Sequence, residues 1–412
     1  MKVRLGDYIQ EYSVKNKDDE NISVYSVTNT KGFCKDYFGK EVASKDKTTY
    51  KIVPYGYFAY NPSRINVGSV DWQRKEKKVI VSPLYNVFSV SPNLERQYLY
   101  YYLKSDFVLQ RIKAVATGSV RDNLKLSMLY EFPIELPKLE NQRKIVKILD
   151  KVSDVIEKKE QELEQLETLV KSRFVELFGN VFLNTMKWEE HSLELIADIV
   201  SGITKGRKMK QQTLMEVPYM AVSNVKDGYI DWTTIKTIEA TEQEINQYRL
   251  LPNDVLMTEG GDPDKVGRGA IIRKPLENCI HQNHIFRVRL NTTYILPEFF
   301  AEYLQHQRAK RYFLRCAKQT TGIASINMKQ LRALPVLIPP IELQNQFADF
   351  VVSVDKSKSG CYHVGFFTII QILFFVFCPL YFFFFCTTVP QFFVIIRIAI
   401  SITCTHRFDD LR

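Results

Sequence analysis

The stretch LPKLENQRKIVKILDKV, from Leu136 to Val152, returns later in the chain as a looser copy, IPPIELQNQFADFVVSVDK, from Ile338 to Lys356. A constant shift of 202 residues aligns identical residues in and just before the two copies. The aligned pairs are Pro133 with Pro335, Pro137 with Pro339, Glu140 with Glu342, and Gln142 with Gln344. Solenoid repeats recur every 20–50 residues or so, and the 202-residue shift between the two copies is several times longer. The chain is therefore predicted to contain two copies of one domain.

Each half is predicted to be a mixed domain of helices and strands, which places the chain in the α+β class. In the first half, residues 1–137, short aromatic and β-branched runs alternate with turn residues, as in YKIVPYGYFAYNPSRINVGSV from Tyr50 to Val70. A helical stretch should follow, because apolar residues recur there on one side, at Leu99, Leu103, Val108 and Ile112. The second half, residues 181–337, repeats this order, and 412 residues leave each half long enough for its own core.

Residues 138–180, between the halves, carry a heptad pattern. Every d position from Leu149 to Leu177 is apolar, and the run KKEQELEQLE supplies charges on the other faces. This pattern predicts a long coiled-coil helix, roughly 50–60 Å in length at 1.5 Å per residue. Gly179 is expected to end it, as glycine commonly does near a helix C-terminus. A long core helix inside one domain is the alternative interpretation.

The composition favours a polyanionic partner without requiring one. Lys and Arg exceed Asp and Glu by ten, 56 against 46, and a basic protein with no such partner is the other interpretation. The seven cysteines form no C-x-x-C pair, so neither a zinc site nor a disulfide framework is expected. The N-terminus has no apolar run after its basic start. We therefore predict a cytoplasmic protein.

The C-terminal residues 359–412 differ in character from the rest. The segment 338–358 should begin a second helix, but an apolar run rich in Phe and Ile follows SKSG at Ser357–Gly360. About 20 apolar residues suffice to span a bilayer, so a membrane segment is one interpretation. Pro379 and Pro390 interrupt the run, and ordered flanking anchors are missing. We interpret this tail as the product of a shifted reading frame, with the membrane segment as the alternative.

The sequence offers no catalytic motif. The loop EGGDPDKVGRGA, Glu259–Ala270, lacks the G-x-x-x-x-G-K-[ST] of a phosphate-binding loop and the third glycine of a dinucleotide fingerprint. No N-P-P-[YF] tetrapeptide for amino methylation of a base is present. His281 and His284 have no Cys or acidic partner at metal-ligand spacing. The chain is predicted to bind without chemistry of its own, with no catalytic residue, metal site or cofactor.

Basic residues in turn-like segments are the candidate binding residues. Lys and Arg neutralise phosphates, and Arg can form two hydrogen bonds to a purine edge in the major groove. Each of these residues alone is as well explained by a solvated surface charge, and only their clustering favours DNA contact. The candidates are Arg64, Arg74, Lys75 and Arg121 in the first half, and Arg207, Lys208, Lys265 and Arg268 in the second.

Two mixed domains, each followed by P-x-x-x-P-x-x-E-x-Q and a helix, resemble the specificity subunit of type I restriction-modification enzymes. The segment from Leu136 to Asn180 is similar to the central conserved region of that family, and IPPIELQNQFADFVVSVDKSKSG is similar to the start of the distal one. The resemblance implies two target-recognition domains that read a bipartite site in double-stranded DNA. It also implies a non-catalytic subunit that binds two modification subunits and recruits motor-nuclease restriction subunits. S-adenosylmethionine, ATP and magnesium would then belong to the partners.

The chain departs from this family at its distal end. The second helix is expected to stop after one or two turns, which would leave an apolar seam of the first helix unpaired. That seam, the expected docking surface, consists of Leu149, Ile156, Leu163 and Val170. Self-association through it, a separate partner helix, or an inactive truncated subunit are the expected consequences. A membrane-anchored basic protein that binds DNA or protein is the alternative function.

Overall fold

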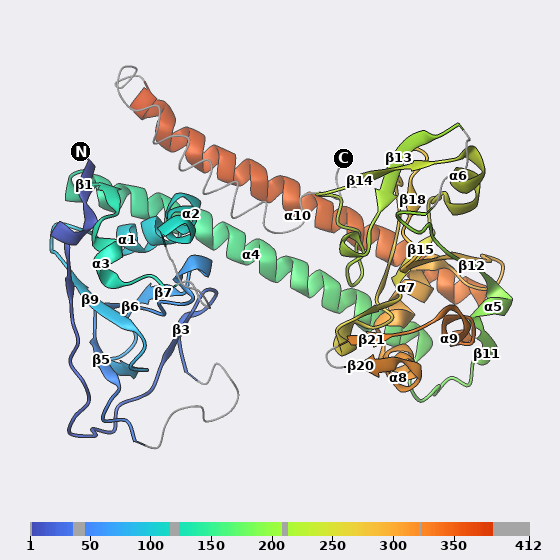
Figure 1. The fold of residues 1–412 in the computed structure, drawn as a ribbon, viewed down its shortest axis with the longest axis horizontal. Helices are drawn as coiled ribbons and strands as arrows, with labels where there is room; N and C mark the ends of the chain where they lie inside the picture. Colours follow the sequence, from blue (N-terminus) through green and yellow to red (C-terminus); the bar gives the residue numbers. More distant parts are fainter. Residues whose placement is uncertain (1, 36–45, 116–122, 208–212, 321–322, 382–412) are drawn as a thin grey trace. The chain divides into compact units, whose positions relative to one another are not determined.

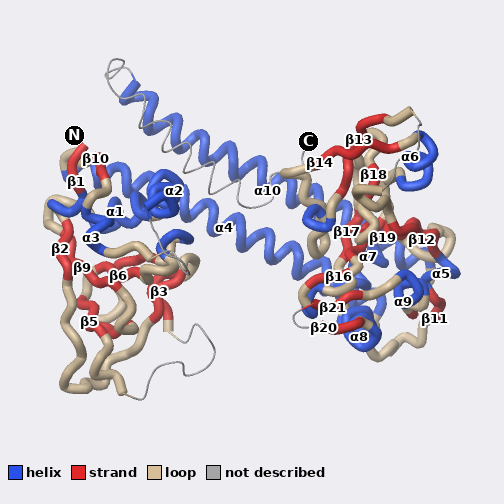
Figure 2. Tube along the Cα trace, viewed as in Figure 1, coloured by secondary structure: helices blue, strands red, loops and turns tan. Residues whose placement is uncertain are grey.

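The structure is a computed structural model that describes residues 2–35, 46–115, 123–207, 213–320 and 323–381. The side chains of residues 264, 319, 320, 323 and 362–381 are not among those described. The chain divides into two compact units, one built on Met1–Ile156 (unit 1) and one on Glu157–Phe366 (unit 2). Both units combine helices with short strands (Figures 1 and 2), which confirms the α+β class.

Unit 1 is built around a four-stranded antiparallel sheet with the strand order β2-β9-β6-β7. Its strands are β2 (Ile9–Glu11), β9 (Asn86–Val90), β6 (Phe58–Tyr60) and β7 (Val70–Trp72). The other pairs are β1 (Lys2–Arg4) with β10 (Pro133–Glu135), β3 (Ser26–Thr28) with β4 (Gly32–Cys34), and β5 (Lys51–Pro54) with β8 (Lys78–Val81). The helices are η1 (Leu5–Asp7), η2 (Ile65–Val67), α1 (Arg96–Leu103), α2 (Asp106–Val115) and α3 (Leu126–Tyr130).

The core of unit 1 lies between this sheet and its helices. Phe58 and Phe88 stack on neighbouring strands with ring centroids 5.1 Å apart, and both rings are fully buried. The predicted apolar stripe on α1 and α2 is confirmed, because all four of its residues are buried in the same cluster. A second, smaller cluster fills the space under β3, β4, β5 and β8.

Unit 2 contains a corresponding antiparallel sheet with the strand order β12-β19-β15-β17. Its strands are β12 (Ala197–Ser201), β19 (Ile285–Leu290), β15 (Val255–Thr258) and β17 (Gly269–Ile271). Strand β11 (Glu189–Ser192) pairs with β22 (Pro335–Ile338). Strand β13 (Met215–Met220) lies between β14 (Lys236–Ala240) and β18 (Ile280–His281). Strand β21 (Ile323–Ser325) lies between β16 (Gly260–Gly261) and β20 (Lys318–Thr320). The helices are α5 (Leu193–Ile196), η3 (Val222–Asn224), α6 (Glu242–Tyr248), η4 (Pro263–Lys265), α7 (Pro297–Gln305), α8 (Gln307–Cys316) and α9 (Met328–Arg332).

The predicted duplication is visible strand by strand. Phe58 pairs with Trp72 on one side and Phe88 on the other, and Val255 pairs in the same way with Ile271 and Val288. The order α1, α2, α3, β10 in the first half repeats as α7, α8, α9, β22 in the second. The two sheets therefore correspond residue by residue, although few side chains are identical.

The repeated junction is explained by its glutamine. Gln142 is fully buried, and its Oε1 accepts a hydrogen bond at 2.8 Å from the backbone N–H of Glu95, the N-cap of α1. Its Nε2 donates to the backbone carbonyls of Asn93 and Pro137, at 3.0 and 2.9 Å. One side chain thus satisfies three backbone groups that burial would otherwise leave without partners.

Gln344 repeats this arrangement in unit 2. It is fully buried and accepts from the N–H of Leu296, the N-cap of α7, at 2.8 Å. It donates to the carbonyls of Tyr294 and Pro339, at 3.0 and 2.8 Å. We call this arrangement the glutamine junction. It ties each globular domain to the start of the long helix that follows.

The predicted central helix is α4 (Leu139–Phe178), a continuous helix of 40 residues. Gly179 follows it with φ +71°, a left-handed conformation that glycine adopts at little cost. A Cβ atom at this position would lie 2.6 Å from the Thr185 side chain. The predicted end of the helix is therefore confirmed.

The distal helix does not stop as expected. Helix α10 runs from Ile341 to Tyr381, a length of 41 residues. The prediction was wrong because a change in composition is not a helix stop: Leu, Ile and Phe propagate a helix at modest cost, and the run contains no proline before Pro379. Within unit 2 the two helices are antiparallel, since Phe174 and Phe178 contact Phe347 while Glu162 lies beside Cys361.

The seam is therefore not bare. Phe347 is fully buried against Phe174 and Phe178, and Val170 packs against the same core. Leu149 is buried, whereas Ile156 and Leu163 are half-buried. The prediction of an unpaired seam is thus wrong at the unit 2 end of α4, where α10 covers it. The reason for expecting self-association through this part of the helix is therefore removed. Among residues with described side chains, no helix has the length and apolarity needed to cross a membrane.

Candidate nucleic-acid interface

Equivalent hairpin loops carry three of the predicted residues. Arg64 lies in the loop between β6 and β7, and Lys265 and Arg268 lie in the loop between β15 and β17. Arg64 is exposed and precedes η2, and its carbonyl accepts hydrogen bonds from Val67 and Ser69. Because β6–β7 and β15–β17 occupy the same place in the two sheets, the duplication places these cations in corresponding loops of the two domains, although at different positions within each loop.

The second loop packs closely against helix α8 of unit 2. Gly267 has φ +72°, and a Cβ atom there would lie 2.1 Å from the ring of Phe313 on α8. Lys265 is exposed and forms an ion pair with Asp262. Arg268 is half-buried, and its Nε has no hydrogen-bond partner in the described part of the chain. The glycine-rich sequence is thus required for close packing, and it presents the charged side chains from a fixed backbone.

Replacing Gly267 with alanine is expected to lower the free energy of unfolding of unit 2 by about 1–3 kcal/mol or more. A left-handed backbone strains any residue with a Cβ, and here the Cβ also overlaps Phe313. Gly206→Ala is the matched control, because Gly206 has φ +76° and nothing within 4 Å of a Cβ atom. Denaturant unfolding of both variants measures the difference. Equal losses would show that the contact with Phe313 does not constrain the loop.

Arg74 and Lys75 lie at the opposite end of β7 from Arg64. The guanidinium of Arg74 stands 4.9 Å from the ring centroid of Trp72 and bonds the buried carboxylate of Asp71 at 3.2 Å. Asp71 also accepts hydrogen bonds from the backbone N–H groups of Phe33 and Trp72. Lys75 is exposed. The structure therefore does not bring these two residues together with Arg64 into one cluster.

Arg207 is occupied by a structural ion pair. Its Nε and Nη2 bond the two carboxylate oxygens of Glu244 at 2.6 and 2.7 Å, and Nη2 also bonds the carbonyl of Glu239. The arginine lowers the pKa of the Glu244 carboxyl below its usual range. Glu244 in turn completes the N-terminal capping box of α6 with Thr241. The Arg207 side chain is thus engaged in packing this corner, while Arg121 and Lys208 lie outside the described residues.

Sequence reasoning missed a polar pair at the adjoining ends of the two central strands, β15 and β19, of the second sheet. The Nδ1 atom of His284 lies 2.5 Å from a carboxylate oxygen of Glu259, at the start of the glycine-rich loop. The two residues are brought together because β15 and β19 are paired, with Thr258 opposite Ile285. No spacing in the sequence signals this contact, since 25 residues separate the partners.

The two histidines have different environments. His281 is buried, its Nδ1 lies 3.1 Å from the carbonyl of Ile285, and burial together with the charge of Arg287 lowers the pKa of its imidazole to about 4. His284 is largely exposed. Within the described residues, no group of three His, Cys, Asp or Glu side chains is placed to hold a metal ion.

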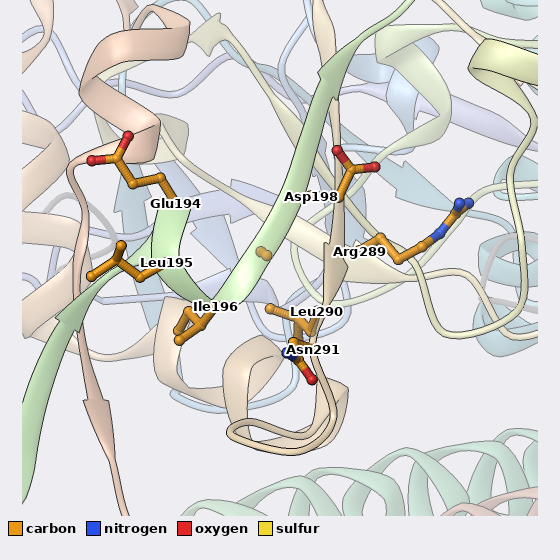
Figure 3. A pocket seen from close by; sticks show the side chains of 8 residues that line it. Glu194, Leu195, Ile196, Asp198, Arg289, Leu290 and Asn291 are labelled. Atoms are coloured by element: carbon orange, nitrogen blue, oxygen red, sulfur yellow. The ribbon is translucent and has the colours of Figure 1, made fainter.

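A shallow pocket of about 400 Å³ lies where α5 meets β12 and the end of β19. Figure 3 shows Asp198 and Arg289 on one side of it and Glu194 and Leu195 on the other. Two of its charged groups have partners: Asp198 bonds Arg287, and Arg289 bonds both oxygens of the buried Asp254 at 2.7 and 2.8 Å. Among the residues that line the pocket, none is a nucleophile with an adjacent base.

Comparison with known proteins identifies the family. The model of the type I restriction modification DNA specificity domain matches residues 3–168 and 186–360. The chain therefore belongs to this family and carries its domain twice, which confirms the resemblance seen in the sequence.

Individual relatives have the same description. The EcoKI specificity subunit of Escherichia coli is 24% identical over 259 residues, covering 60% of this chain and 56% of the relative. The StySPI specificity subunit of Salmonella potsdam is 25% identical over 269 residues, covering 62% of this chain and 56% of the relative. The chain thus matches a little over half the length of these curated relatives. A crystal structure of a type I system S subunit from M. genitalium covers 90% of this chain and 93% of its own, with 16% identity and a TM-score of 0.49.

Proposed function

We propose that this chain is the DNA-specificity subunit of a type I restriction-modification complex and recognises a bipartite site in double-stranded DNA. The observation that carries the proposal is the duplication: two domains with the same sheet, the same helix order and the same glutamine junction, joined by α4. Two copies of a reading domain on one chain suit a site made of two half-sites, whose separation is a property of protein geometry.

The hairpin loops are the proposed base-reading elements. Arg64 in the first domain and Lys265 and Arg268 in the second project from equivalent loops, while the loop sequences around them differ. Differing loops on a common scaffold suit two half-sites of different sequence, because base edges are read by the side chains that reach them. Arg207 is proposed only as support for this surface, since Glu244 holds its guanidinium.

The long helices are the proposed docking surface for two modification subunits. Ile156 and Leu163 on α4 stay half-exposed, and the charged residues of KKEQELEQLE surround them. In this proposal the chain is not an enzyme: S-adenosylmethionine is bound by the modification subunits, and ATP and magnesium by motor-nuclease restriction subunits.

Co-expression with modification subunits of a type I system, followed by mapping of methylated adenines, tests the proposal. The expected result is methylation at one bipartite sequence with two specified parts and a fixed unspecified gap. Methylation that is absent without this chain and present with it assigns the specificity to the chain. If a stable complex forms but the methylated sites are the same with and without this chain, the proposal is contradicted.

A one-heptad insertion into α4 after Glu160 is expected to lengthen the gap between the half-sites. Seven residues add about 10 Å of helix at 1.5 Å per residue, or about three base pairs at roughly 3.4 Å each. A second heptad is inserted into α10 after Cys361. It preserves the antiparallel register between α4 and α10, because Glu162 faces Cys361. The readout is the methylated sequence, with the same heptad placed in the exposed turn at Asp18 as the control. An unchanged gap in an active double insertion would refute a ruler role for α4.

A further inference from the structure

Two identical dipeptides occupy the same position in the two domains. Arg74-Lys75 begins two residues after Trp72, and Arg273-Lys274 begins two residues after Ile271. Trp72 and Ile271 are themselves equivalent, because they pair with Phe58 and Val255 in matching sheets. Each Arg-Lys pair therefore leaves the end of the edge strand at the same point of its domain.

The backbone before each pair is fixed in the same way. In unit 1, Gln73 donates its N–H to Tyr57 at 2.8 Å and its carbonyl accepts from Gly56 at 2.7 Å. In unit 2, Ile272 donates to Asp254 and accepts from Asn253, both at 2.9 Å. Gly56 has φ +85° and Asn253 has φ +73°, so both turns contain a left-handed residue.

The side chains of the two pairs are also presented alike. Arg74 is held by Asp71 and the ring of Trp72, and Arg273 is held by Glu298 at 2.5 Å and Asn253 at 3.2 Å. Both arginine side chains are 40% exposed. The neighbouring lysines are exposed, and neither forms an ion pair within the described residues. Each domain thus offers one guanidinium held by its neighbours and one exposed ammonium.

Local packing does not explain why the dipeptide is the same in both domains. The buried residue just before it is Gln73 in one domain and Ile272 in the other, and the residue after it is Glu76 or Pro275. The hairpin loops at the other end of the edge strand also differ. The exposed Arg-Lys pair is identical in the two domains although its neighbours differ. This identity favours a role that is the same in both domains, because reading two different half-sites requires different residues.

We propose that the two Arg-Lys pairs bind DNA phosphates independently of sequence, one pair at each half-site. This rests on the proposed function and assigns a part of it to residues outside the hairpin loops. Phosphate is the common chemistry of any two half-sites, and it is bound by oriented guanidinium groups and by lysine as a compact charge. Contacts of this kind set the position of a domain on the duplex while the loops discriminate bases.

The full-length double variant Lys75→Ala, Lys274→Ala tests the proposal against a duplex library with a randomised central segment. The affinity is expected to fall by a similar factor for every sequence, while the preferred sequence stays the same. The slope of log K against log salt should fall by about 0.9 for each phosphate that is no longer neutralised, or about 2 in all. Lys17→Ala, Lys329→Ala removes the same charge from two exposed lysines elsewhere and should leave the slope nearly unchanged.

The outcomes separate this proposal from the proposed function. Three results would overturn the phosphate assignment. The salt slope of the double variant could equal that of the charge-matched control, or its sequence preference could change. The variant could also bind DNA like the wild type and lose only the ability to bind a modification subunit. Arg64→Ala and Arg268→Ala, by contrast, should alter the preference at one half-site each. If the wild-type chain binds the library without any sequence preference, the proposed function fails, and the salt slopes still decide the role of the Arg-Lys pairs.

Discussion

Replacing Gln344 with methionine is expected to lower the free energy of unfolding of unit 2 by about 3–9 kcal/mol. The methionine side chain keeps the volume but removes three hydrogen bonds, to the N–H of Leu296 and the carbonyls of Tyr294 and Pro339. Each buried group left without a partner costs roughly 1–3 kcal/mol. Gln142→Met should act in the same way on unit 1, because its three partners are equivalent.

Denaturant unfolding with hydrogen exchange read separately in each unit measures these losses. Gln346→Met in unit 2 and Gln110→Met in unit 1 are the matched controls, since both glutamines lie exposed on helices of the unit whose unfolding is measured. The controls are expected to change stability by less than about 0.5 kcal/mol. A loss below about 1 kcal/mol for Gln344→Met would mean that water replaces the side chain, and that the glutamine junction does not fix the domain.

Replacing Phe347 with alanine is expected to cost about 3–5 kcal/mol and to free α10 from α4 within unit 2. A fully buried phenylalanine leaves a cavity when truncated, and neighbouring rings cannot fill it without moving. The rings of Phe174 and Phe178 lie 5.3 and 5.7 Å from that of Phe347, both nearly perpendicular to it. These edge-to-face contacts add to the cost of the lost apolar burial.

The matching control is Val352→Ala, because Val352 lies on the same helix with 43% of its surface exposed. Hydrogen exchange of amides in Ile341–Gly360 and in Glu157–Phe178 reports on the two helices separately. Faster exchange in both segments of the Phe347 variant is the expected result. Loss of protection in α10 alone would show that α4 is held by the domain and not by the helix pair.

The order of domains and long helices could be predicted from the sequence wherever a local pattern is repeated along the chain. The long helix α4 (Leu139–Phe178) was predicted because a heptad pattern and a terminal glycine are local signals. The role of Gln142 was not accessible, since its partners near the start of α1 lie 47 and 49 residues away in the chain. The C-terminal end of α10 was predicted wrongly, because the change to an apolar composition after Gly360 was taken as the end of the helix.

The candidate site could be predicted only as a set of exposed cations. Turn-like segments correctly indicated that Arg64, Arg74 and Lys75 are exposed. The ion pair between Arg207 and Glu244 joins residues 37 positions apart, and no local pattern announces it. Arg273 and Lys274 were visible as basic residues, but their equivalence to Arg74 and Lys75 depends on strand register, which only the structure supplies.

The hydrogen bonds that form the glutamine junction join the glutamine only to main-chain atoms of the domain that it holds. A peptide N–H and a carbonyl are present whatever side chains the domain carries, so this attachment places no demand on the identity of those side chains. The side chains of each domain can therefore diverge while these hydrogen bonds stay the same. Under the proposed function, a change of target sequence then requires no change in the attachment of the domain to its helix.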